Sequence, residues 1–107
     1  MHSYHFEYKR SVRLVHMDIP KVQETGYTIY TKSECGWCRR VKEMLPEATV
    51  FNCDSFLGSN KEEFLHEMSK KIGKEHRTFP MVFYEGGFIG GYEDTKNFRD
   101  FDINLEF

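Results

Sequence analysis

The sequence predicts an α/β protein in which a small mixed sheet of four strands is flanked by about three helices. Short stretches rich in Tyr, Thr, Val, Ile and Phe alternate along the chain with longer stretches of helical periodicity. Two strand-like stretches then follow one another, joined by Glu-Gly-Gly at residues 85–87, which predicts a hairpin. A chain of 107 residues suits one domain of this kind.

The first half of the predicted domain is a β-α-β unit. Two stretches rich in strand-forming side chains predict strands at residues 26–31 and 48–53. Residues 36–45 between them predict a helix, because Cys38, Val41 and Leu45 fall on one face at helical spacing. Strands joined through a helix in this way are parallel, so the sheet is expected to contain a parallel pair.

The second half is predicted as a helix, a hairpin and a last helix. The helix covers residues 59–73, and Ser59 and Glu62 have the spacing of a capping box at its start. The two hairpin strands are predicted at residues 80–84 and 88–91. Residues 93–101 predict the last helix, with Phe98 and Phe101 facing inward.

Residues 1–25 are interpreted as an N-terminal extension, and residues 26–107 as the main domain. Phe6 and Tyr8 alternate with polar residues, as do Val12 and Leu14, which is typical of a half-buried strand. The pattern is short and interrupted by charges. An extra edge strand and a loose arm therefore both remain open.

Composition and charge exclude several classes of protein. The formal net charge of −2 gives no general attraction to nucleic acid. No apolar run approaches the roughly 18 residues of a membrane span, and residues 1–20 lack the apolar stretch of a secretory signal. We therefore expect a cytoplasmic, reducing location with no membrane partner. Three cysteines fit a disulfide framework poorly, so they are interpreted first as reactive or metal-binding.

The Cys-Gly-Trp-Cys sequence at residues 35–38 predicts a reactive thiol pair. Cys35 falls at the junction of the first strand and first helix, where free N–H groups and the helix dipole favour a thiolate. Lys32, Arg39 and Arg40 add positive charge nearby. Cys38 lies one turn inside the helix on its buried face. The expected roles are that Cys35 attacks a disulfide and Cys38 resolves the mixed disulfide that forms.

A zinc clip and a permanent disulfide are the alternatives to a reactive pair. Structural zinc usually needs four ligands, whereas Cys53 stands alone in a predicted strand and the five histidines show no ligand spacing. We expect Cys53 to pack as a small hydrophobic side chain. A Cys-x-x-Cys that closes a β-α turn is typical of redox proteins.

Four motifs together identify a family. Lys-x-x-Cys-Gly-Trp-Cys at residues 32–38 is followed by Arg-Thr-Phe-Pro at 77–80, Gly-Gly at 90–91 and Glu-Asp at 93–94. From about residue 26 to residue 101 the chain resembles the glutaredoxin family. The resemblance implies a thioredoxin fold and a glutathione-dependent thiol–disulfide oxidoreductase. Its partners would be glutathione, as reductant, and disulfide-bearing or glutathionylated proteins.

The resemblance also implies a glutathione groove beside Cys35. The implied binding residues are Lys32, Trp37, Arg77, Thr78, Phe79, Pro80, Gly91, Tyr92 and Glu93. Pro80 would be a cis-proline that faces the two cysteines. The backbone of Phe79 would pair with the cysteinyl part of glutathione, as an added strand does.

The remaining implied contacts match the charges of glutathione, which carries two carboxylates and one amine. Lys32 and Arg77 would bind the glycyl carboxylate. Trp37 would form a wall of the groove, and Gly91 would let the ligand approach the backbone closely. Main-chain N–H groups at the last helix's N-terminus, together with Glu93, would hold the γ-glutamyl end.

One departure from the family's commonest active site keeps other functions open. A glycine and a tryptophan stand here between the cysteines in place of proline and tyrosine. Small residues at the position of Gly36 occur in family members that bind a [2Fe–2S] cluster between two chains. A cluster-bridged dimer with Cys35 as ligand is therefore an alternative to the expected monomer. A thioredoxin-like electron donor, for example to ribonucleotide reductase, is another, although Lys32, Arg77 and Glu93 favour glutathione.

Overall fold

The computed structural model describes residues 17–105, with side chains as far as Phe101. The elements of this part of the chain are β1 (Tyr27–Thr31), α2 (Gly36–Met44), β2 (Thr49–Asn52), a 3-10 turn η1 (Asp54–Phe56), α3 (Lys61–Ile72), β3 (Met81–Tyr84), β4 (Gly87–Gly90) and α4 (Tyr92–Leu105). The predicted β-α-β-α-β-β-α order is confirmed. Within the described range, no helix is long and apolar enough to span a bilayer.

The four strands form one mixed sheet in the order β2-β1-β3-β4. β1 runs parallel to β2, with Ile29 opposite Val50. It runs antiparallel to β3, with Ile29 opposite Val82. β3 and β4 form the predicted antiparallel hairpin. The central position of β1 and β3 explains why their side chains are mostly buried, whereas those of β2 are mostly exposed.

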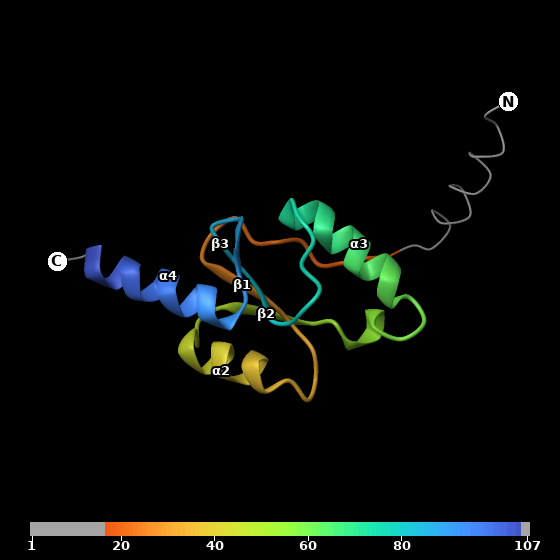
Figure 1. The fold of residues 1–107 in the computed structure, drawn as a ribbon, viewed down its shortest axis with the longest axis horizontal. Coiled ribbons are helices and arrows are strands. Elements are labelled where there is room, and N and C mark those ends of the chain that lie inside the picture. The colour runs from red at the N-terminus through yellow and green to blue at the C-terminus, as the bar shows by residue number, and fades with distance from the viewer. Residues whose placement is uncertain (1–16, 106–107) are drawn as a thin grey trace, which may run out of the picture.

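Helices cover both faces of the sheet, with α2 and α4 on one face and α3 on the other (Figure 1). Successive residues of a strand point to opposite faces, so β1 contributes side chains to the hydrophobic core on each face of the sheet. Ile29 packs with Val41 of α2 in one core. Tyr30 packs with Phe64 of α3 in the other.

Residues 17–25 lie against the main domain without forming a strand (Figure 1, orange). Met17, Ile19 and Val22 pack against the core on the α3 side. The buried Tyr30 hydroxyl donates a hydrogen bond to the Pro20 carbonyl at 2.5 Å. This part of the predicted extension is therefore fixed to the core. The strand patterns within residues 1–16 lie outside the described residues, and the domain boundary at residue 25 stays a prediction.

Two expectations about helix ends were wrong. The capping box of Ser59 and Glu62 does not form, because α3 begins at Lys61 after Asn60, without a side-chain cap. Phe101 does not face inward but is 61% exposed, since α4 continues past the edge of the sheet (Figure 1). Phe98, one turn earlier, does pack inward, with its ring centroid 5.3 Å from that of Tyr84.

Cys53 is fully buried in the α3-side core, as the sequence predicts for a packing role. Burial, with a smaller contribution from the charge of Asp54, raises the pKa of its thiol from 9.0 to about 12. The folded chain therefore keeps this proton at pH values where the unfolded chain has released it. Its stabilising effect is complete below about pH 9 and is lost as the pH rises towards about 12.

We expect the Cys53→Ala variant to lose stability less steeply than the parent chain in this alkaline range. The difference in slope should approach about 1.4 kcal/mol per pH unit, the contribution of one proton. Urea unfolding of both chains from pH 8 to about 10.5, at one fixed concentration of reductant, measures this difference in slope. Burial, with a smaller contribution from the charge of Cys53, also raises the pKa of Tyr30 to about 12. The larger contribution, from burial, is common to both chains and cancels. Parallel slopes would contradict the prediction.

Candidate active site

The two cysteines of the 35–38 motif form a disulfide at the start of α2, with Cα atoms 5.2 Å apart. Cys35 is the N-cap residue of the helix, and its Sγ accepts a hydrogen bond from the Cys38 N–H at 3.2 Å. Cys35 is partly exposed, whereas Cys38 is 1% exposed. This is the oxidised form of the pair, and the exposed cysteine is the one predicted to attack.

A carboxylate holds the loop that precedes Cys35. Asp54, the first residue of η1 and two residues after the end of β2, accepts hydrogen bonds from the Ser33 N–H at 2.9 Å and the Ser33 hydroxyl at 2.5 Å. These bonds lower the pKa of Asp54, with a small contribution from the charge of Lys32. Asp54 was not among the predicted site residues. Its position could have been inferred, because the parallel strands β1 and β2 end at the same edge of the sheet.

The segment before β3 faces the cysteines. The Phe79–Pro80 peptide bond is cis, which agrees with the position implied for a cis-proline. The Phe79 carbonyl oxygen lies 3.9 Å from Cys35 Sγ. The Lys32 ammonium lies 5.9 Å from the centre of the Phe79 ring. Phe79 therefore lies beside Cys35, with Lys32 near its ring and Pro80 next to it in the chain.

The start of α4 lies next to Trp37, which stands between the two cysteines in sequence. The Trp37 ring, 54% exposed, lies 5.1 Å from the Tyr92 ring between centroids. The Arg40 guanidinium lies 5.3 Å from the Trp37 ring centre and 6.0 Å from that of Tyr92. Arg40, predicted only as a nearby positive charge, thus contacts two aromatic residues of the predicted site.

The two glycines of the Gly-Gly motif before α4 differ in the space available for a side chain. Gly90 has φ +142°, and a Cβ placed there would collide with the carboxylate side chain of Asp94. A Cβ on Gly91 would have only ordinary contact with the Pro80 carbonyl oxygen, at 3.7 Å. Gly90 is therefore required by the chain itself. Glu93, predicted to hold an amine, is exposed in the first turn of α4.

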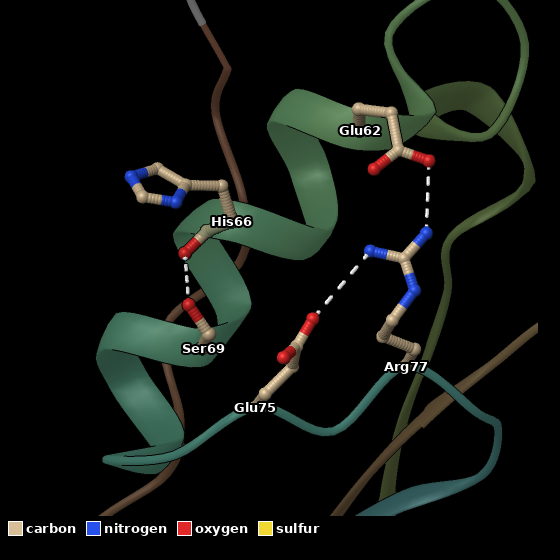
Figure 2. Close-up of polar contacts among 5 residues, drawn as sticks. All are labelled: Glu62, His66, Ser69, Glu75 and Arg77. Carbon is tan, nitrogen blue, oxygen red and sulfur yellow. Dashed lines mark hydrogen bonds and ion pairs between the residues drawn. The ribbon is translucent and has the colours of Figure 1, made fainter.

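Arg77 points towards α3 and is bound to two acidic side chains, Glu62 on that helix and Glu75 in the loop after it (Figure 2). Its guanidinium lies 2.8 Å from Glu62 and 3.9 Å from Glu75. The neighbouring Thr78 hydroxyl lies 3.4 Å from the ring of His76. Arg77 precedes the cis-proline Pro80 by three residues, and its charge is already paired with Glu62 and Glu75.

A hollow of about 590 Å³ runs along α3 and the loop that follows it. Arg77 contributes to its lining, but neither active-site cysteine does. It is therefore a separate surface feature beside the groove expected at Cys35. Among residues 17–101 no group of three His, Cys, Asp or Glu side chains is arranged to hold a metal ion.

Known proteins match this chain over most of the described domain. The sequence profile of the Glutaredoxin family matches residues 27–89. Glutaredoxin-2 of Schizosaccharomyces pombe is 30% identical over 83 residues, which cover 73% of this chain and 71% of that protein. An uncharacterized monothiol glutaredoxin of Caenorhabditis elegans is 31% identical over 70 residues, 64% of this chain. The match covers 47% of that relative, so this chain spans about half its length.

Among solved structures, glutaredoxin 1 from Francisella tularensis, complexed with cacodylate, aligns with a TM-score of 0.62 at 26% identity. The alignment covers 74% of this chain and 96% of that one. The thioredoxin fold and a Cys35–Cys38 pair at a helix N-terminus define the class of dithiol thiol–disulfide oxidoreductases. Within that class, the chain belongs to the glutaredoxin family.

Proposed function

We propose that the protein uses reduced glutathione to reduce protein disulfides and glutathione mixed disulfides. The observation that carries the proposal is the position of Cys35. It is the partly exposed member of the pair, caps α2, and faces the Phe79 carbonyl that precedes a cis-proline. A disulfide sulfur approaching Cys35 would therefore meet a backbone edge that can hold an extended peptide such as glutathione.

The proposed reaction transfers two electrons from glutathione to the substrate disulfide. The Cys35 thiolate attacks one sulfur of the substrate disulfide, and the other sulfur leaves as a thiolate that takes up a proton. With a protein disulfide, Cys38 then attacks Cys35 Sγ, so the substrate leaves as a dithiol and the pair becomes the disulfide seen here. Two glutathione molecules reduce that disulfide and become glutathione disulfide. With a glutathione mixed disulfide, a second glutathione can resolve the intermediate without Cys38.

The charges around Cys35 support glutathione as the partner. Lys32 lies near the Phe79 ring, where it would bind the glycyl carboxylate. The first turn of α4 lies next to Trp37, where free N–H groups would bind the γ-glutamyl carboxylate and Glu93 the amine. Trp37, next to Tyr92, would form a wall between these ends. Turnover of a small mixed disulfide with glutathione, coupled to glutathione reductase, tests the proposal.

We expect the Cys38→Ser variant to separate the two activities. It should retain reduction of the glutathione mixed disulfide, because glutathione can resolve the Cys35 intermediate. It should lose reduction of a protein disulfide by the dithiol route, down to the rate without protein. Parallel assays of both substrates at one glutathione concentration measure this. Equal loss of both activities would contradict the proposed division of roles.

The other functions expected from the sequence stay predictions. A [2Fe–2S] cluster held by Cys35 of two chains is suggested by the small residue at position 36. The fold itself does not require glycine there, because a Cβ at Gly36 would have no neighbour within 4 Å. Iron and acid-labile sulfide measured after anaerobic purification test it. A thioredoxin-like donor would instead turn over with a thioredoxin reductase and without glutathione.

A further inference from the structure

Arg77, the proposed ligand of the glycyl carboxylate, is already bound by carboxylates of this chain (Figure 2). Glu62, in the first turn of α3, accepts a hydrogen bond from Arg77 Nη2 at 2.8 Å. Glu75, in the loop before β3, lies 3.9 Å from Arg77 Nη1. All three side chains are largely exposed, so these ion pairs form and break in contact with water.

This ion pair lies beside the backbone proposed to bind glutathione. Arg77 precedes Phe79 by two residues, and the Phe79 carbonyl is 3.9 Å from Cys35 Sγ. On the helix, Glu62 precedes Phe64 by two residues, and the Phe64 ring stacks on the Phe79 ring at 6.3 Å between centroids. Arg77 and Glu62 therefore each lie two residues from one of the two stacked rings, Phe79 and Phe64.

The charges at this position disfavour a further carboxylate. One guanidinium faces two carboxylates, so the three groups together carry one negative charge. An incoming glycyl carboxylate has to share the donor atoms of Arg77 with Glu62, which holds Nη2, and it then lies close to the negative charge of Glu62. Glu62 is ionised at neutral pH, and the hydrogen bond from Arg77 lowers its pKa further below the ordinary value of 4.5.

We propose that Glu62 is a specificity-determining residue, which competes with the glycyl carboxylate of glutathione for Arg77 and so weakens recognition of that carboxylate. The inference rests on the glutathione-dependent function proposed above. It follows that the site accepts disulfides with a neutral group at this position nearly as well as glutathione. Protein disulfides, whose backbone continues as an amide where glutathione ends in a carboxylate, are substrates of this kind.

The test compares two mixed disulfides of one cysteine peptide. One carries glutathione, and the other carries glutathione whose glycyl carboxylate is blocked as an ethyl ester. Reduced full-length protein is mixed in excess with each, and release of the peptide thiol is followed in a single turnover. We expect the parent chain to react with the two at similar rates. Glu62→Gln should accelerate the glutathione substrate about two- to fivefold, as for an exposed ion pair, and leave the ester rate unchanged.

Two further variants make the result specific to Arg77. Glu67→Gln removes the same charge from the same helix, where it breaks the exposed pair with Lys70, and should change neither rate. Glu62→Gln combined with Arg77→Gln should lose the gain for glutathione. A Glu62→Gln variant that changes both substrates equally, or neither, would overturn the proposal and leave the ion pair with only a structural role.

The same assay separates failure of this inference from failure of the proposed function. If the parent chain reduces a protein disulfide but reacts with neither mixed disulfide, glutathione is not its partner, and both proposals are wrong. If it reacts with both mixed disulfides and Glu62→Gln has no selective effect, only the role of Glu62 is wrong.

Discussion

Replacement of Cys35 by serine is expected to abolish disulfide reduction, with both protein disulfides and glutathione mixed disulfides. A thiolate attacks a disulfide, whereas a serine hydroxyl stays protonated near neutral pH and forms no comparable bond to sulfur. Cys38 is not able to take over, because it is 1% exposed. The measurement is turnover of a small mixed disulfide with glutathione and glutathione reductase, which should fall to the rate without protein.

Cys53→Ala is the matched control for that experiment. It removes the third thiol, which is fully buried in the core on the other face of the sheet from α2. Its turnover should equal that of the parent chain at pH 7.5. Residual turnover in Cys35→Ser together with loss of turnover in Cys38→Ser would assign the attack to Cys38. That outcome would reverse the roles given to the pair.

The Phe64→Ala variant is expected to lose about 3–5 kcal/mol of unfolding free energy, the usual cost of deleting a buried aromatic ring. Phe64 is fully buried and stacks between Phe56, at 5.1 Å, and Phe79, at 6.3 Å. Its removal leaves a cavity that rigid strands on one side prevent from closing. Urea unfolding at pH 7.5 measures the loss.

Phe101→Ala is the control, since that ring is 61% exposed. It should change the unfolding free energy by less than about 0.5 kcal/mol, as is usual for surface substitutions. Phe64→Ala should also slow disulfide reduction in the folded fraction, because Phe79 loses the ring that fixes it beside Cys35. A loss of less than about 1 kcal/mol in Phe64→Ala would show that the surrounding core refills the site.

The order of elements was predictable because it depends on local patterns. Strand-forming stretches and helical spacing placed β1, α2 and the hairpin to within a few residues. The ends of α3 and α4 were less predictable, since they depend on distant contacts. Glu62 is turned to Arg77, 15 residues later, rather than to its own helix terminus. Phe101 is exposed because the sheet beneath α4 has already ended.

The candidate active site likewise has a part that was predictable from local sequence and a part that was not. Cys35 and Cys38 were placed by a motif and by a helix terminus, which are local features. The contacts that complete the site join residues far apart in sequence. Asp54 holds Ser33 across 21 residues, and Trp37 meets Tyr92 through the packing of α2 against α4. Residue spacing within one helix or strand does not predict such contacts, because these residues come together only when the sheet folds.

Trp37 gives the protein an optical reporter of its own redox state. It is the single tryptophan of the chain and lies between the two cysteines in sequence, with its ring 54% exposed. A nearby disulfide accepts an electron from an excited indole and quenches its emission, whereas a dithiol does so far less. We therefore expect the intensity of this one fluorophore to follow opening and closing of the Cys35–Cys38 bond in real time, without a label.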